Sequence, residues 1–246
     1  METAATDQAE RMISILADML RADRHVAVGA ASPIPGAAAL LAREEARAAG
    51  RRLHVTILHS LSENHFTDGA RELFDAAAQG RIDTFFLGGV QIDGAANINL
   101  VGIGDYPAMK KRFSGSFGSA LMYFAVPKVI LFREEHSPRT LVESVDFISA
   151  PGTSAADIWR PGGCHALVTN RAVFGFDRDQ GRFRLDQLSP GETAESVREM
   201  TGFAYDPGAP VRSEAPGASR RALIRERVAP KVAAFYPEFA ARIWGA

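Results

Sequence analysis

One glutamate stands where a reactive carboxylate could act. The loop Ser60-Leu61-Ser62-Glu63-Asn64-His65 follows an apolar segment, residues 53–58, that we expect to form a strand. A carboxylate in a cleft at the end of a strand can serve as a nucleophile or as a general base. Composition alone favours the simpler interpretation, a solvated loop glutamate. The residues alone therefore do not decide whether Glu63 is a reactive carboxylate or a solvated surface glutamate.

A second candidate is a glycine-rich stretch, residues 88–118, that begins directly after the expected strand 84–87. In an open α/β sheet, ligands bind beyond the carboxyl ends of strands, where glycine lets backbone N–H groups approach them. The residues that we predict to contact a ligand are Gly88, Gly89, Gln91, Asn97, Asn99, Gly115, Ser116 and Gly118. Turns without a ligand would explain the glycines equally well, and no dinucleotide or phosphate-loop pattern occurs here.

Histidine and cysteine give no metal site. His59 and His65 share one loop, but they lack an acidic partner and a zinc-ligand spacing. The single cysteine, Cys164, lies in an apolar segment and is expected to be an inert core thiol. Residues 134–136 follow a strand and could face a cleft, or could be caps and surface charges. We predict no metal and no permanently bound cofactor.

The elements that must position these residues alternate along the chain. Helical periodicity or composition marks residues 7–22, 37–49 and 70–78, and apolar runs mark strands at 25–29, 53–58, 84–87 and 129–132. Strands that are apolar throughout are typical of sheets buried on both faces. We therefore predict an α/β fold, with an open, mostly parallel sheet and helices on both faces.

The remainder of the chain predicts further elements of the same domain. Strands are expected at 142–148 and 164–169, and a hairpin around residues 179–181. Thr193 is a predicted N-cap, although Ser196 offers no capping-box acid. A C-terminal helix over 222–244 should be broken at its prolines. We see no linker, so residues 1–246 are predicted to form one domain.

Composition narrows the class of protein. The net charge of −1 over 246 residues gives no electrostatic case for nucleic acid or for a membrane surface. The first ten residues are polar and acidic, unlike a signal peptide. No stretch approaches the ~20 apolar residues that span a bilayer. We expect a soluble, cytoplasmic protein.

Several segments, in this order, resemble the β subunit of glutaconate CoA-transferase and its relatives. They are the proline-containing turn at 33–37, GGVQID at 88–93 with NIN at 97–99, GDY at 104–106, FSGS at 113–116, VDFISAPG at 145–152, TGF at 201–203 and LIR at 223–225. The block 88–119 is the most specific of them. The resemblance covers nearly the whole chain.

The resemblance implies an enzyme with an obligate α subunit, in a heterodimer or heterotetramer, and CoA and acyl-CoA as substrates. In this family one β-subunit glutamate attacks the thioester and becomes an enzyme–CoA thioester. An acceptor carboxylic acid then takes the CoA from the enzyme and becomes the new acyl-CoA. Backbone N–H groups of a glycine-rich loop stabilise the oxyanion.

This sequence departs from the family pattern at the nucleophile. The family has glutamate, serine and glycine after its second strand, whereas His59, Ser60 and Leu61 stand here. Either the loop is longer and Glu63 is the nucleophile, or the covalent mechanism has been lost. Relatives without that glutamate include hydrolases that open rings of steroid-derived acyl-CoA compounds, in which the α subunit is expected to carry the catalytic carboxylate. His59 would then be a candidate contact of the substrate carbonyl.

Two further points remain open at this level. A roomy apolar lining for a bulky acyl group could come from Phe66, Phe117, Met122, Tyr123 and Phe124, or these residues could be core. A non-enzymatic ligand-sensing domain of the same broad fold is the third alternative. The absence of a DNA-binding segment and of a basic patch disfavours it.

Overall fold

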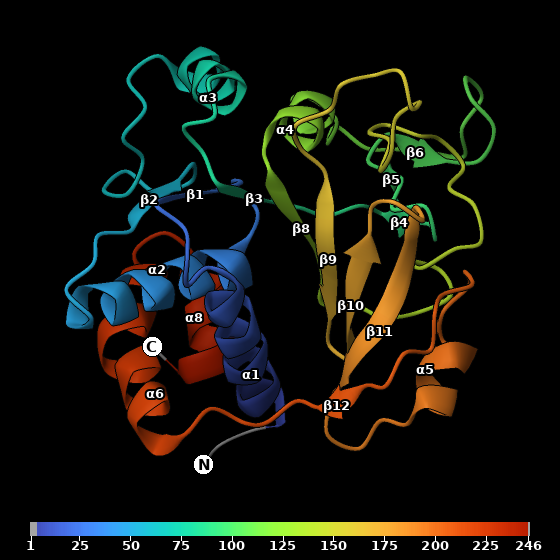
Figure 1. Ribbon diagram of the computed structural model, residues 1–246. Coiled ribbons are helices and arrows are strands. Elements are labelled where there is room, and N and C mark those ends of the chain that lie inside the picture. The colour runs from blue at the N-terminus through green and yellow to red at the C-terminus, as the bar shows by residue number, and fades with distance from the viewer. Residues whose placement is uncertain (1–3, 246) are drawn as a thin grey trace. The chain divides into compact units, whose positions relative to one another are not determined.

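The computed structural model describes residues 4–245, and its contacts divide the chain into two compact units (Figure 1). The first contains the described part of residues 1–73 together with 81–86 and 213–245. The second contains residues 74–80 and 87–212. The first residues of the polar start, 1–3, lie outside the described part. Helix α3 (Gly69–Ala78) is divided between the units.

The first unit is built on parallel strands. β1 (His25–Val28) pairs with both β2 (His54–Ile57) and β3 (Thr84–Leu87), and both pairs are parallel. The last three residues of β1 are fully buried. Because successive side chains of a strand point to opposite faces, both faces of β1 must be covered.

Helices from the two ends of the chain pack in this unit. α2 (Pro33–Ala48) contacts β1 and β2 and also packs against α1 (Ala4–Met19). The C-terminal segment continues through α6 (Ala218–Leu223), a π-helical turn η1 (Ile224–Val228), α7 (Ala229–Ala233) and α8 (Pro237–Trp244). Helix α8 contacts α1, and α7 contacts α2. The first unit therefore depends on contacts between residues more than 200 positions apart.

The second unit contains a mixed sheet in the order β12-β11-β10-β9-β8. Its strands are β8 (Lys128–Arg133), β9 (Cys164–Thr169), β10 (Ala172–Asp177), β11 (Arg182–Leu188) and β12 (Val211–Arg212). β8 and β9 are parallel, as are β11 and β12, whereas β10 is antiparallel to both of its neighbours.

The glycine-rich segment, residues 88–118, contains two short pairs of strands. β4 (Gln91–Ile92) pairs with β5 (Ile98–Asn99), and β6 (Gly102–Ile103) pairs with β7 (Lys111–Arg112), both antiparallel. The short helices are α4 (Ser119–Ala125) and α5 (Ala194–Glu199). No helix within residues 4–245 is long and apolar enough to cross a membrane.

The predicted α/β fold with mainly parallel pairing is confirmed, but the strand predicted at 142–148 is wrong. That segment is irregular, and its backbone forms hydrogen bonds with the hairpin of β4 and β5 instead. The N–H of Val142 donates to the carbonyl of Ile92 at 3.0 Å, and that of Asp146 donates to the side chain of Gln91 at 2.9 Å. These partners leave no continuous ladder for a strand.

The helix expected over residues 37–49 begins four residues earlier, at Pro33. Proline is tolerated there, because the N–H groups of a first helical turn have no partner within the helix. Thr193 is the N-cap as predicted, and Ser196 completes the capping box with its hydroxyl in place of an acid. The two units are compact parts of one chain, so the single domain over 1–246 stays a prediction.

Candidate functional site

The loop after β2 folds back along that strand. The N–H of Ile57 donates to the carbonyl of Glu63 at 3.0 Å, and the N–H of Asn64 donates to the carbonyl of Ser60 at 3.1 Å. The hydroxyl of Ser60 accepts from the N–H of Glu63 at 3.1 Å. These local bonds fix the backbone that carries Glu63.

The carboxylate of Glu63 is held by Arg43 of α2. Arg43 Nη1 lies 2.5 Å from Glu63 Oε2, and Nη2 lies 2.7 Å from Oε1, so the ion pair is bidentate. The side chain of Glu63 is 13% exposed and that of Arg43 is 24% exposed. Bidentate arginine–carboxylate pairs are strong and directional. Glu63 is therefore fixed against α2.

The charge of Glu63 follows from this pairing. Burial acts to raise its pKa, but the hydrogen bonds and charge of Arg43 outweigh burial, and the pKa lies below its ordinary value. The hydrogen bonds to Glu63 likewise raise the pKa of Arg43. Glu63 is thus ionised at neutral pH, the state that a nucleophile or a base requires, but both of its oxygens are engaged.

His59 lies on the surface and contacts another element. Its ring stacks on that of Tyr236, with centroids 5.2 Å apart and planes at 10°. The hydroxyl of Tyr236 donates to the carbonyl of Ala30 at 2.5 Å and accepts from the N–H of Ser32 at 3.2 Å. The structure therefore ties His59 to the residue before α8, whereas Glu63 in the same loop is tied to α2.

Other histidines gather beside the same loop. The ring of His54 lies 4.4 Å from that of His25 and 4.9 Å from that of His65. Burial, the main cause, lowers the pKa of both His25 and His54. No group of three or more histidine, cysteine, aspartate or glutamate side chains within residues 4–245 could hold a metal ion.

In the glycine-rich segment, the predicted amide contacts are used inside the protein. Asn99 is fully buried, and its Nδ2 donates to Gln91 Oε1 and to the carbonyl of Gly102, both at 2.7 Å. Asn99 Oδ1 accepts from the N–H groups of Val101 and Gly102. These bonds shape the turn, and ligand binding by Gln91 and Asn99 stays a prediction.

Asn97 closes the first hairpin in a similar way. Its Nδ2 donates to Asp93 Oδ2, and its Oδ1 accepts from the N–H of Gly152, both at 3.0 Å. Asp93 also accepts from the N–H groups of Ala95 and Asn97. The side chain of Asn97 therefore stabilises the loop, and its contact with a ligand stays a prediction.

The predicted glycines differ in how closely other atoms approach them and in their exposure. A Cβ on Gly89 would lie 2.6 Å from the carbonyl oxygen of Gln91, and one on Gly118 would lie 2.5 Å from the ring of Phe74. Gly88 approaches the backbone of β8. Gly115 and Ser116 lie in an exposed loop before α4. These close contacts account for glycine at positions 89 and 118, and Gly115 and Ser116 are exposed to solvent.

The remaining predicted residues are mostly structural. Met122 and Tyr123 are buried in the core, whereas Phe117 is 82% exposed. His136 is buried between the hydroxyls of two threonines. Burial raises the pKa of the Cys164 thiol to about 12, which leaves it protonated and inert as expected.

Comparison with known proteins supplies the family. Residues 8–200 match the family described as Coenzyme A transferase. The chain belongs to this family. The match covers more than half of the chain and includes the Glu63 loop and the glycine-rich segment.

Some relatives are named as CoA-transferase subunits and others as hydrolase subunits. Over 152 residues the chain is 34% identical to the B-type subunit of glutaconate CoA-transferase from Acidaminococcus fermentans, which is 59% of this chain and 56% of that protein. Over 137 residues it is 30% identical to a cholesterol ring-cleaving hydrolase IpdB subunit of Rhodococcus jostii, 54% of this chain and 53% of that one. The chain spans about half the length of these two relatives.

The fold is shared over a greater length. The crystal structure of glutaconate coenzyme A-transferase from Acidaminococcus fermentans superposes with a TM-score of 0.79 at 24% identity, and it covers 93% of this chain and 96% of that one. At this identity the likeness shows the fold alone. The two chains thus share their fold over nearly their whole lengths.

Arg43 is the site residue that the sequence analysis missed. It lies in the middle of a helix, 20 positions before Glu63. Its role depends on the loop that returns along β2. An arginine in an otherwise alanine-rich helix offered only a weak signal.

Proposed function

We propose that this chain is the B-type subunit of a heteromeric CoA-transferase that moves CoA between an acyl-CoA and a carboxylic acid. The family match over residues 8–200 carries the proposal, and the similarity to the B-type subunit of a glutaconate CoA-transferase supports it. The partner is an A-type subunit. CoA and acyl-CoA are substrates, no cofactor stays bound, and the proposed location is the cytoplasm.

Glu63 is the proposed nucleophile. One carboxylate oxygen attacks the acyl-CoA carbonyl and expels CoA thiolate, which leaves an acyl–glutamyl anhydride. The thiolate then attacks the glutamyl carbonyl, releases the acyl group as a carboxylate and leaves a glutamyl–CoA thioester. An acceptor carboxylate reverses both steps. For the first attack, one oxygen of Glu63 must leave Arg43.

The test is covalent trapping in the two-subunit enzyme. The chain is purified with its partner polypeptide, mixed with a panel of acyl-CoA compounds, reduced with borohydride and weighed by mass spectrometry. We expect this chain to lose mass at Glu63, because the thioester is reduced to an alcohol. Glu63→Gln should lower transferase turnover by at least ~1000-fold.

A matched control comes from the second unit. Glu192 is also paired with an arginine, Arg171, at 2.9 Å, and its side chain is 19% exposed. Glu192→Gln therefore removes an equivalent ion pair without touching the Glu63 loop, and should keep transferase activity. A comparable loss in both variants would show a defect of stability rather than of chemistry.

A ring-opening acyl-CoA hydrolase is the second candidate, and the bidentate engagement of Glu63 by Arg43 favours it. In that case Glu63 is a structural carboxylate and the partner subunit carries the reacting group. Acyl-CoA would be consumed without an acceptor acid, and Glu63→Gln would retain turnover. The similarity to an IpdB subunit supports this alternative.

A further inference from the structure

A cavity of about 700 Å³ in the first unit is lined mainly by arginine side chains. Its lining consists of Arg24, Arg43, Arg47, Arg51, Arg52, Leu53 and His54, and we call it the arginine pocket. Arg43 and Arg47 are one helical turn apart on α2, so they share a face of that helix. The other lining residues come from the turn after α2, from the start of β2 and from the residue before β1.

The turn that presents the arginines has a defined geometry. Gly50 adopts a left-handed φ of 71°, and its N–H donates to the carbonyl of Arg47 at 3.1 Å. The N–H of Arg51 donates to the carbonyl of Ala46 at 2.8 Å. These two bonds form a Schellman motif, which ends the helix and fixes the backbone of Arg51.

The arginine pocket carries unbalanced charge. Arg24 is neutralised by Asp83 at 3.0 Å, and Arg43 by Glu63. The side chains of Arg47, Arg51 and Arg52 are exposed, and none of them forms an ion pair with another residue in the described part of the chain. The macrodipole of α2 favours a cation in its last turn, which accounts for Arg47. Arg51 and Arg52 lie beyond the helix end.

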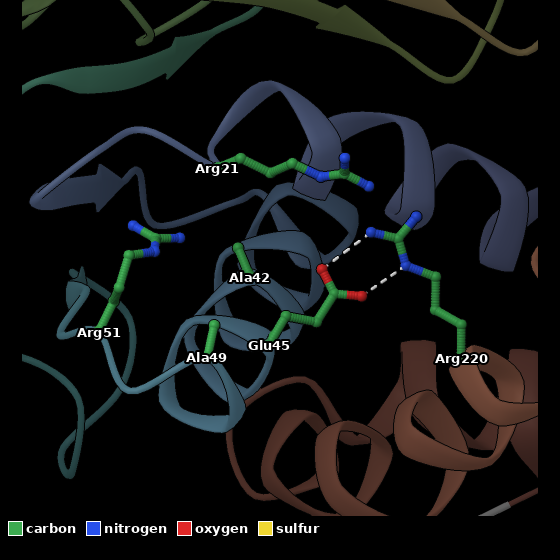
Figure 2. Close-up of a pocket in the computed structure, with 6 residues that line it drawn as sticks. All are labelled: Arg21, Ala42, Glu45, Ala49, Arg51 and Arg220. Atoms are coloured by element: carbon green, nitrogen blue, oxygen red, sulfur yellow. Dashed lines mark hydrogen bonds and ion pairs between the residues drawn. The ribbon is translucent and has the colours of Figure 1, made fainter.

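In a neighbouring cavity the arginines other than Arg51 are paired with carboxylates. It measures about 650 Å³ and is lined by Arg21, Ala42, Glu45, Ala49, Arg51 and Arg220 (Figure 2). There Glu45 binds Arg220 at 2.6 Å, and Asp18 binds both Arg220 and Arg21 at 2.7 Å. Arg51 lines both cavities, and in Figure 2 it stands apart from the paired side chains. The excess of positive charge therefore belongs to the arginine pocket.

We propose that the arginine pocket binds the phosphate groups of a small diphosphate-bearing ligand. Guanidinium groups match phosphate oxygens in bidentate geometry and remain charged at all physiological pH values. The three unpaired cations suit a diphosphate, which carries several negative charges. Two sources supply this chemistry, a free polyphosphate effector and the nucleotide end of CoA. The binding of phosphate does not depend on the role of Glu63.

The first experiment measures inorganic pyrophosphate binding to the full chain by calorimetry at constant ionic strength. Arg51→Ala combined with Arg52→Ala should weaken binding by at least ~10-fold, because each lost guanidinium removes a charge-assisted hydrogen bond. The control combines Arg198→Ala with Arg227→Ala, two exposed arginines without an ion pair in the described structure. It removes the same charge and should change affinity by less than about twofold.

Three results would overturn the proposal. The first is that the unmodified chain does not bind pyrophosphate at millimolar concentration. The second is that the control variant loses as much affinity as the variant at Arg51 and Arg52. The third is that the variant at Arg51 and Arg52 keeps full affinity. Arg51→Lys with Arg52→Lys separates geometry from charge, and should bind more weakly than the unmodified chain. Thermal unfolding of every variant should match the parent, since both substituted side chains are exposed.

Competition then identifies the source of the phosphate. If CoA displaces pyrophosphate and pantetheine, which lacks the nucleotide, does not, the pocket holds the nucleotide end of CoA. If neither displaces it, the pocket binds a separate phosphorylated effector. Both outcomes support a phosphate site in the arginine pocket. If pantetheine displaces pyrophosphate at the same concentration as CoA does, the phosphate site is contradicted.

Discussion

The Arg43–Glu63 pair sets a definite requirement on catalysis. Pairing keeps the carboxylate ionised, which a nucleophile needs, but it also directs both oxygens towards the guanidinium. Separating a largely buried ion pair is costly, unless another anion takes the place of the carboxylate beside the arginine. If Glu63 reacts, substrate binding or the partner subunit must therefore supply a new partner for Arg43.

His136 gives a pH-dependent prediction at the same scale. Burial, its main cause, together with the positive charge of Arg171 lowers the pKa of His136 from 6.5 to about 4. The ring contacts the hydroxyls of Thr169 at 2.8 Å and Thr201 at 2.9 Å. Between pH 6.5 and 4 the unfolded chain binds a proton that the folded chain does not. Stability from this residue is thus complete above pH 6.5 and is lost as the pH falls towards 4.

The measurement is urea unfolding from pH 7 to pH 4.5. His136 alone contributes a slope of up to about 1.4 kcal/mol per pH unit. His136→Gln should be less stable at pH 7, yet its stability should fall less steeply with acidification. Parallel curves for the variant and the parent would show that His136 does not resist protonation.

At the scale of elements, Asn99 fixes the glycine-rich segment. It links β4 to β5 through Gln91 and it satisfies the backbone of the turn at Val101 and Gly102. Asn99→Leu would leave the carbonyl of Gly102 and the N–H groups of Val101 and Gly102 without these partners, at about 1–3 kcal/mol each. We expect a loss of roughly 3–5 kcal/mol in the free energy of unfolding, measured in urea.

A variant of the same hairpin provides the comparison. Asn97 is only half-buried, so water can replace its bonds to Asp93 and Gly152 in Asn97→Ala. That variant should lose less than half as much stability as Asn99→Leu. Equal losses, or a stable Asn99→Leu variant, would show that the amide network is not what holds the segment.

The sequence predicted the elements better than their side-chain partners. Apolar runs located β1 and β8, because burial on both faces requires continuous apolar residues. Residues 142–148 are only partly apolar, and the β4–β5 hairpin binds a backbone N–H of this segment. Likewise Glu63 was found from its position after β2. Its partner Arg43 was not, because that pair exists only once the loop folds back.

On the scale of the chain, the first unit joins helices that lie near its two ends. Thr6 of α1 donates to the carbonyl of Ile243 in α8 at 2.7 Å, and Arg221 binds Asp7 at 2.7 Å. Glu10, fully buried in α1, is bound by Arg225 of η1 through two contacts at 2.7 and 2.9 Å. These contacts span more than 200 residues, so this unit closes only after its last segment is present.

Arg225→Ala tests that closure. Removing one partner of a buried ion pair leaves an uncompensated charge, so the free energy of unfolding should fall by about 3 kcal/mol in urea titrations. Arg21→Ala is the matched control, because its partner Asp18 is 45% exposed and water can replace the cation. It should lose under about 1 kcal/mol. If both variants unfold alike, the buried carboxylate of Glu10 does not depend on η1, and the ends of the chain are held by apolar packing alone.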